Sequence, residues 1–409
     1  MGKKILAINP GSTSTKIAIY LDSEPIYTKT FQHSPDDLAQ FNNVPEQYEW
    51  RRDMIINDLE ENGINLHELD AIIGRGGLLR PVESGVFEVN DAMVHDLIHA
   101  ERQHASNLGG LIARHIGDMI GVRSFIADPV VVDEMIPYAR ISGLPELPRE
   151  SIFHALNQKA IARRYARENE ARYEELNLIV CHMGGGITVS AHRAGKVIDT
   201  TNALNGCGPF SPERAGTLPP GPLAKLCFSG KYTEDEIMRL IHGKGGLVAH
   251  LGTTSIPEVL DRVDHGDLHA MLIIRAMCYS VAKEIGAMAI ALCGNVDAIL
   301  LTGGVAHSKR ITDYLAVHCN FIAPIYVYPG ENELLALAQN ACGALQGELE
   351  VKKYESALPD DPAHINDTSR PSKLREWLTA ARLTNYASRR KLSAMREYLR
   401  SWRRPWRSN

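Results

Sequence analysis

A short loop near the N-terminus carries more hydrogen-bond donors than a turn requires. The stretch ILAINPGSTSTKIAIY, residues 5–20, places eight small or polar residues between two apolar runs. A hairpin turn needs only about two residues. The backbone N–H of Gly11 and the hydroxyls of Ser12 and Ser14 are donors that suit the oxygens of a phosphate group. Because the Walker spacing G-x-x-x-x-G-K-[ST] is absent, a phosphate-binding loop here would belong to another class.

One later segment repeats this hairpin, and a third element places two glycines between a strand and a helix. Residues 176–199, LNLIVCHMGGGITVSAHRAGKVID, predict a second hairpin with three glycines at its turn. Residues 297–308, DAILLTGGVAHS, predict a buried strand that runs through two glycines into a helix. Glycine lets the backbone come close to an anion, so these turns predict a protein of two lobes with a nucleotide in the cleft between them. The residues concerned are His182, Gly184, Gly185, Gly186, Gly303 and Gly304.

Strand-like and helix-like patterns alternate through residues 1–355, which is typical of the α/β class. The expected strands occupy residues 4–9, 15–20, 70–74, 124–127, 177–182, 187–192, 197–199, 297–302 and 324–328. The expected helices occupy residues 50–62, 90–120, 155–170, 233–242, 256–263, 267–293, 308–317 and 333–346.

Length and charge predict the domain organisation. A chain of 409 residues predicts two or three domains. We expect a first lobe over 1–150, joined by the helix within 333–355, and a second lobe over 151–332. Residues 356–409 hold twelve Lys/Arg and five acidic residues, a net charge of +7 against −5 for the whole chain. This abrupt change predicts a separate basic tail that is helical or disordered.

Cysteine usage and hydropathy indicate the compartment. The seven cysteines are scattered and form no C-x-x-C pair, which argues against a disulfide framework or a zinc site and for a reducing cytoplasm. Lys3 and Lys4 lead directly into a strand, unlike a signal peptide. The most apolar helical run, near 285–293, is too short to span a bilayer. We therefore expect a cytoplasmic protein with neither a membrane nor a nucleic acid as partner.

Four motifs carry a family resemblance. In chain order, over about residues 3–352, NPGSTSTK, GRGGLLRP, CHMGGG and GPFSPERAG resemble the acetate and butyrate kinase family of the actin/hexokinase-type ATPase superfamily. The resemblance implies a duplicated fold of mixed sheets with helices around a nucleotide cleft. It also implies reversible transfer of a phosphoryl group from ATP to butyrate or a short branched fatty acid, which gives an acyl phosphate and ADP. Mg²⁺ would be the cofactor, and a homodimer or higher homo-oligomer the assembly.

That reaction sets its own chemical requirements. A carboxylic acid titrates near pH 4–5, so the nucleophile is already ionised at neutral pH and needs no general base. The obstacle is repulsion between the carboxylate and the γ-phosphate. Catalysis therefore depends on positioning and on positive charge around the transition state.

The resemblance assigns residues to the nucleotide. Asn9, Ser12, Ser14 and Lys16 would approach the transferring phosphoryl group. His182 and the three glycines after Met183 would lie beside the β- and γ-phosphates, and Gly303 and Gly304 would pass the adenosine. The alternatives without a ligand are an ordinary Ser/Thr-rich hairpin, a histidine that only fills the end of a strand, and a turn that only leads into a helix.

It also assigns the reacting centre. Arg214 would clamp the carboxylate or the moving phosphoryl group, because its planar fork suits oxyanion pairs, and His154 would donate a hydrogen bond to the transition state. A second arginine is either Arg75 or Arg80, and we prefer Arg75. The expected metal residues are Asp128, which would orient magnesium or its bound water, and Glu333.

Each assignment has a structural alternative: a surface arginine, a buried histidine, an Asp-Pro turn and an acid at a helix start. Three other functions also stay open. These are an acetate or propionate kinase of the same family, a non-catalytic ATP-switched binding protein, and a phosphatase or polyphosphate hydrolase of the same fold.

Overall fold

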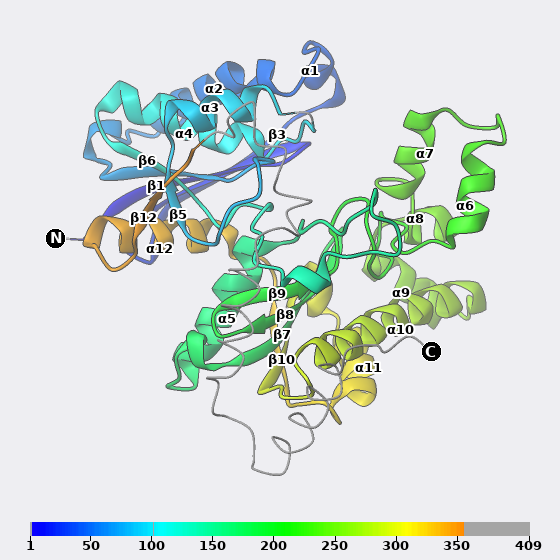
Figure 1. Cartoon of the computed structure of the whole chain (residues 1–409). Coiled ribbons are helices and arrows are strands. Elements are labelled where there is room, and N and C mark those ends of the chain that lie inside the picture. Colours follow the sequence, from blue (N-terminus) through cyan, green and yellow to red (C-terminus); the bar gives the residue numbers. More distant parts are fainter. Residues whose placement is uncertain (1, 101, 356–409) are drawn as a thin grey trace, which may run out of the picture. The chain divides into compact units, whose positions relative to one another are not determined.

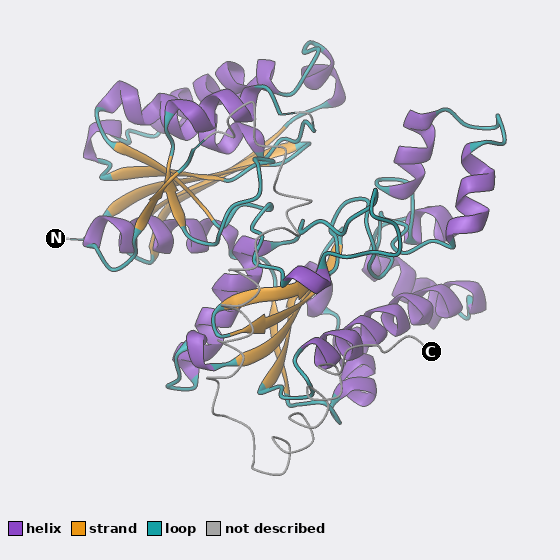
Figure 2. Cartoon of the chain, in the orientation of Figure 1, coloured by secondary structure: helices purple, strands orange, loops and turns teal. Residues whose placement is uncertain are grey.

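The computed structural model describes residues 2–100 and 102–355. These residues form two mixed β-sheets covered by helices, which confirms the α/β class (Figure 1, Figure 2). The expected basic tail, 356–409, lies outside the described residues. No helix within the described ranges is both long enough and apolar enough to cross a membrane.

The first sheet has seven strands in the order β12-β5-β6-β4-β1-β2-β3. The first three strands form an antiparallel meander, and β4 and β6 continue the sheet parallel to β1. The bounds are β1 (Lys4–Pro10), β2 (Ser14–Leu21), β3 (Glu24–Gln32), β4 (Ala71–Arg75), β5 (Val86–Glu88), β6 (Arg123–Ala127) and β12 (Val351–Lys353).

The second sheet has five strands in the order β11-β10-β7-β8-β9. It again begins with an antiparallel meander, and β10 and β11 continue parallel to β7. The bounds are β7 (Asn177–Met183), β8 (Ile187–Arg193), β9 (Lys196–Thr200), β10 (Ala298–Gly303) and β11 (Ile325–Pro329). The segment β3-β2-β1-β4-β6 thus has the same order as β9-β8-β7-β10-β11. The repeated hairpins seen in the sequence are therefore equivalent parts of a duplicated topology.

Helices cover both faces of the first sheet. Along β1, Leu6 and Ile8 point to one core while Ile5 and Ala7 point to the other, as the two-residue period of a strand requires. The first core lies beneath α2 (Tyr48–Glu61), α3 (Asp91–Ile98) and α4 (Asn107–Ile120), and the second lies beneath α12 (Glu333–Gln346) (Figure 1).

The second sheet is covered in the same way. One face packs against α5 (Ala155–Glu168), which also contacts α12, and the other packs against α10 (Leu268–Ala291), with α11 (Lys309–Cys319) beside it (Figure 1). Four further helices follow β9, and a short one follows β3. Their bounds are α6 (Pro220–Cys227), α7 (Glu234–Ile241), α8 (Leu247–Leu251), α9 (Ile256–Asp264) and α1 (Pro35–Ala39).

One expected helix is wrong. The pattern over 90–120 predicts a continuous helix, but α3 ends at Ile98 and α4 begins at Asn107. The side chain of Asn107 lies against the backbone of Gly77, where a Cβ on that glycine would overlap it. The segment before α4 is thus shaped by contacts with the loop after β4, which a helical period does not reveal.

Candidate active site

The first hairpin turn is held from behind by a buried arginine. Gly11 N–H donates to Ser14 O at 2.7 Å and closes the turn. Arg51, on α2, is 1% exposed and donates from Nη1 to Gly11 O at 2.8 Å and to Ser14 O at 3.3 Å. Ser12 and Lys16 are exposed, and Ser14 is half-buried. The turn therefore presents its hydroxyls and its lysine to solvent while its carbonyls are bound inside.

Arg75 meets residues from both ends of the chain. Its Nη1 donates to Glu333 Oε2 at 2.9 Å and to Asn9 Oδ1 at 3.3 Å, and Asn9 Nδ2 donates to the same glutamate oxygen at 2.6 Å. The end of β4 is fixed because α4 packs directly on its backbone, where a Cβ on Gly109 would overlap Arg75 O. Of the two candidate arginines, Arg80 instead lies over the ring of Tyr354, with 4.9 Å from its Cζ to the ring centroid.

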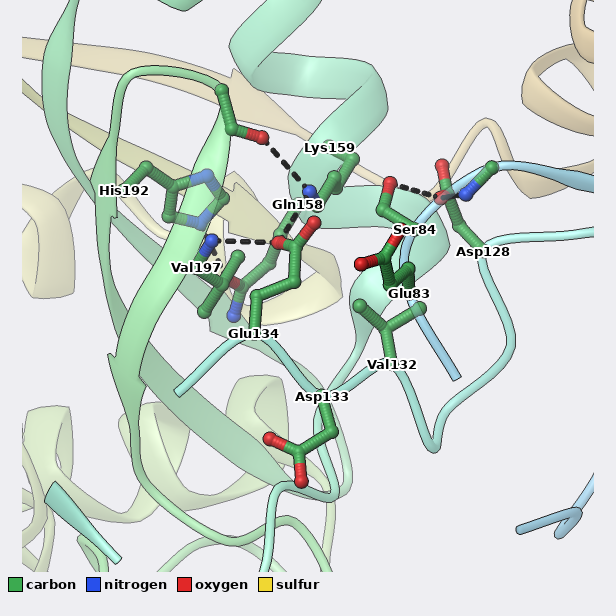
Figure 3. Close-up of polar contacts among 12 residues, drawn as sticks. Glu83, Ser84, Asp128, Val132, Asp133, Glu134, Gln158, Lys159, His192 and Val197 are labelled. Carbon is green, nitrogen blue, oxygen red and sulfur yellow. Dashed lines mark hydrogen bonds and ion pairs between the residues drawn. The ribbon is translucent and has the colours of Figure 1, made fainter. Parts of the chain in front are cut away.

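Asp128 follows β6, is buried, and accepts hydrogen bonds at both carboxylate oxygens (Figure 3). Its Oδ1 accepts from the Ser84 hydroxyl at 2.6 Å and from Gly85 N–H at 2.9 Å, while Oδ2 accepts from Arg163 at 3.1 Å. Burial alone raises the pKa of this carboxyl, but Arg163 and Lys159 outweigh it and hold the pKa below the ordinary value. Its φ of +39° lies in the left-handed region that non-glycine residues rarely adopt. Asp128 is thus an anion whose oxygens are engaged by the chain's own donors.

Two histidines from different elements stack on each other. His154 precedes α5, His182 ends β7, and their ring centroids lie 3.8 Å apart with an angle of 12° between the planes. His182 Nδ1 lies 2.8 Å from Asn157 Oδ1, and its Nε2 lies 3.1 Å from Glu331 Oε1. The hydrogen bond with His182 lowers the pKa of Glu331 to about 2. Burial, then His182, Arg214 and Arg75, lower the pKa of His154 well below its ordinary value, so this imidazole is neutral.

The triple-glycine turn and the SPERAG segment form one unit. Ser211 Oγ donates to Gly185 O at 2.6 Å. A Cβ on Gly186 would overlap Nη1 of Arg214, so only glycine fits beneath this guanidinium. Nη1 of Arg214 also donates to Ala203 O. At Gly184, a Cβ would come close to Glu331 and His182, because the turn runs directly past both side chains.

The Gly-Gly turn after β10 has two different glycines. Gly303 has a φ of +89°, and a Cβ there would overlap the backbone of Met183 on the neighbouring strand. Gly304 has open space where its Cβ would be. Gly303 is therefore required for packing and backbone conformation, whereas Gly304 leaves bare backbone beside an open region.

A small cavity joins several of these side chains. It has a volume of about 10 Å³, room for about one water molecule, and is lined by Arg75, Asp128, His154 and Glu333, with Gly76, Val130, Ala155 and Leu156. Four residues singled out in separate sequence motifs thus line one space. Among the described residues, no group of three or more His, Cys, Asp or Glu side chains is arranged to hold a metal ion.

Two carboxylates, those of Asp128 and Glu333, are the expected magnesium ligands. Asp128 and Glu333 are each paired with an arginine. Magnesium usually keeps several waters and takes one or two carboxylates plus substrate phosphates. The two carboxylates therefore suit an ion that arrives with a nucleotide better than a resident metal site.

Four side chains of the site were not singled out from the sequence. Arg51 reads as a surface charge on a polar helix, although it is buried. Asn157 and Gln158 follow His154 in the run FHALNQ, and this H-x-x-N-Q spacing is a signal that places polar groups on the first turn of α5. Glu331, two residues before Glu333, carries no signal beyond a pair of acids.

Comparison with known proteins places the chain in a family. The model of the Acetokinase family matches residues 147–324. Butyrate kinase 2 of Clostridium acetobutylicum is 54% identical over 353 residues, which cover 86% of this chain and 99% of that protein. A probable butyrate kinase of Bacteroides thetaiotaomicron is also 54% identical over 353 residues, covering 86% of this chain and 100% of that protein.

Solved structures share the fold. Acetate kinase from Porphyromonas gingivalis superposes with a TM-score of 0.69 at 19% identity, covering 84% of this chain and 100% of that one. A propionate kinase from Francisella tularensis gives 0.67 at 20% identity, with coverages of 83% and 98%. These likenesses confirm the expected duplicated ATPase-type fold. With half of its residues shared with relatives along nearly their whole length, this chain belongs to the Acetokinase family.

Proposed function

We propose that this protein is a butyrate kinase. It would transfer the γ-phosphoryl group of ATP, reversibly, to butyrate or a short branched fatty acid and release ADP and an acyl phosphate. Sequence identity of 54% to a butyrate kinase over most of the chain supports the reaction. The observation that carries the site is that residues from four separate sequence motifs, Arg75, Asp128, His154 and Glu333, line one small cavity. Arg75 and Arg214 also contribute to lowering the pKa of His154. Two arginines beside a neutral histidine that can donate a hydrogen bond suit a phosphoryl group whose negative charge is spread over several oxygens.

The proposed mechanism needs no general base. The acceptor carboxylate is already ionised, so Arg75 and Arg214 would offset its repulsion from the γ-phosphate and hold both anions in line. His154, neutral, would donate a hydrogen bond to the transferring phosphoryl group. The hairpin turn at Gly11–Ser14 and the turn at Gly184–Gly186 would hold the phosphates from the two sheets.

Magnesium would enter with the nucleotide as part of the substrate. Asp128 would orient one of its waters, and Glu333 would lie near it at the start of α12. The ion would supply charge neutralisation on the phosphates when bound. Asn9 and Arg75 both donate to the Glu333 carboxylate, so its position is fixed before any nucleotide would bind beside it.

We also propose that the two sheets are the cores of two lobes, 1–150 with 333–355, and 151–332. Closure of these lobes on ATP would exclude water from the transferring group. Gly304 would leave room for the adenosine, in keeping with the open space at its Cα.

One assay tests the function. Acyl phosphate is trapped as a hydroxamate with acetate, propionate, butyrate and isobutyrate in turn, with ATP and magnesium. We expect the highest kcat/KM with a four-carbon acid, since each buried methylene adds about 1 kcal/mol. A maximum with acetate or propionate would assign the neighbouring activity. ATP turnover that needs no acid would indicate a hydrolase, and nucleotide binding without turnover would indicate a binding protein.

A matched pair of arginine variants tests the site. Arg75→Ala should lower kcat/KM by about 100-fold or more, because it removes a charge from the transition state. Arg80→Ala serves as the control, since this arginine stacks on Tyr354 away from the cluster. Equal losses in the two variants, measured on folded protein, would contradict the placement of Arg75 in the site.

A further inference from the structure

A line of buried hydrogen bonds runs behind His154. Gln158 follows it by four residues, in the first turn of α5, and both side chains reach Thr188 of β8. His154 Nδ1 lies 2.9 Å from Thr188 Oγ1, and Gln158 Nε2 lies 2.9 Å from the same hydroxyl. On its other side Gln158 Oε1 lies 3.0 Å from His192 Nε2, and His192 Nδ1 lies 2.7 Å from the Tyr173 hydroxyl.

The direction of this line is fixed by one backbone carbonyl. Gln158 Nε2 also lies 3.3 Å from Thr188 O, and a carbonyl oxygen can only accept. The amide nitrogen of Gln158 must therefore face Thr188, and its oxygen must face His192. His192 then donates from Nε2. Burial keeps this ring neutral by lowering its pKa well below the ordinary value, so its Nδ1 accepts from Tyr173.

The same constraint reaches His154. The buried Thr188 hydroxyl accepts from Gln158, and its only other partner among the described residues is Nδ1 of His154. Its own hydrogen would otherwise be left without an acceptor, so it is donated to Nδ1. A neutral imidazole whose Nδ1 accepts carries its hydrogen on Nε2. Within residues 2–100 and 102–355, Nε2 of His154 makes no hydrogen bond, and His154 is one of the residues that line the cavity shared with Arg75 and Asp128.

We propose that Thr188 and Gln158 are positioning residues that hold His154 as the Nε2–H tautomer, with its hydrogen directed at the transferring phosphoryl group. The consequence for the reaction rests on the kinase function proposed above. The opposite tautomer would place a lone pair against the developing negative charge and would lose the donor. The stack on His182, at 3.8 Å between ring centroids, holds the plane of the ring while Thr188 holds its proton.

The tautomer is measured directly on the wild-type full chain. Protein labelled with ¹⁵N-histidine is examined by long-range ¹H–¹⁵N correlation between about pH 8 and pH 6, with His154→Asn to assign the signals. We expect a protonated Nε2 and an unprotonated Nδ1 on His154 throughout this range. A protonated Nδ1, or an imidazolium in this range, would overturn the proposal.

Three threonine variants link the tautomer to turnover. Thr188→Val removes the donor to Nδ1 and should lower kcat by about tenfold or more, with KM for the acid within about twofold. Thr188→Ser keeps a hydroxyl and should restore most of kcat. Thr200→Val is the control, because Thr200 is an equally buried strand residue whose hydroxyl bonds Ser190 and Thr201 instead.

The outcomes separate this proposal from the kinase function. The proposal is wrong if Thr188→Val keeps the wild-type kcat, or if Thr200→Val loses as much. If Thr188→Val does not fold, the tautomer in the wild-type chain still decides. Nε2–H with no hydroxamate formed would refute the kinase function alone, while Nδ1–H in an active kinase would refute the positioning role alone.

Discussion

The guanidinium of Arg214 occupies space that a side chain at Gly186 would fill. It crosses the Cα of Gly186, and its Nη1 donates to Ala203 O. Burial lowers its pKa, and Glu213 partly restores it. Arg214 and Gly186 stand 28 residues apart in motifs that look independent in the sequence. The lack of a side chain at Gly186 therefore leaves room for the arginine, apart from any contact with a phosphate.

Gly186→Ala should therefore displace Arg214. We expect kcat/KM to fall by at least about tenfold, and the double variant Gly186→Ala/Arg214→Ala to be no worse than Arg214→Ala alone, because both changes remove one interaction. Hydroxamate kinetics on the four proteins of this cycle measure the coupling. Independent, additive losses would show that the glycine acts on the phosphates without the arginine.

At the scale of single residues, the sequence predicts which residues belong to the site, but not which of their side chains contact each other. Asn9, Arg75 and Glu333 come from three motifs, and the contact between Arg75 and Glu333 spans 258 residues. The choice between Arg75 and Arg80 could not be made from the sequence, since both lie in one glycine-rich segment. Gln158 was missed because the H-x-x-N-Q spacing places it on the first turn of α5 but does not reveal the strand that it faces.

At the scale of elements, the β1–β2 hairpin depends on a charge behind it. Arg51 donates to two carbonyls of the turn, to Thr15 Oγ1 at 3.0 Å and to Gln47 Oε1 at 2.7 Å, with no carboxylate among these acceptors. Burial lowers its pKa to about 10, so it remains a cation at neutral pH. The hairpin therefore has a positive charge bound to its inner side.

Arg51→Met should loosen this turn. We expect the free energy of unfolding to fall by about 2 kcal/mol or more, because several buried acceptors lose their donor. The KM for ATP should rise as well. The neighbouring Arg52→Met is the control, since Arg52 contacts the exposed carboxylate of Asp53 at 2.7 Å and the ring of His115 at 2.9 Å rather than the turn, so its loss should lower stability less than the loss of Arg51. Urea denaturation and steady-state kinetics of both variants decide, and equal effects would contradict the prediction.

The sequence predicted most buried elements and missed exposed ones. The nine expected strands all occur, because apolar runs mark buried strands. β3 was missed since it lies at a sheet edge with its side chains largely exposed, and β5 and β12 are only three residues long. Register and sheet order come from tertiary contacts, which a periodic pattern does not contain.

At the scale of the whole molecule, burial keeps the imidazoles of several histidines neutral. Burial is the largest cause in each case, and it lowers the pKa of His33 and His104 to about 4 and that of His154 and His192 well below the ordinary value. In the unfolded chain each would titrate near pH 6.5. Below that pH the unfolded chain binds protons that the native chain does not.

Stability should therefore fall on mild acidification. Between about pH 6.5 and pH 5, each fully buried imidazole contributes a slope of up to about 1.4 kcal/mol per pH unit, with the native state more stable at the higher pH. Urea midpoints measured across this range check the expectation. His318→Gln, at an exposed histidine, should leave the slope unchanged. A midpoint that stays constant or rises on acidification would show that these rings are charged in the native protein.

The hydrogen bond between Asn9 and Glu333 closes a loop of 324 residues. A ribosome delivers the N-terminal strands long before it delivers α12. Until then Arg75 lacks its carboxylate, and the face of β1 that carries Ile5 and Ala7 lacks α12, which packs against it. A nascent chain that stops short of α12 therefore exposes apolar side chains of β1 to water and leaves Arg75 without Glu333, so we expect this core and this ion pair to form only after residue 346 has been made.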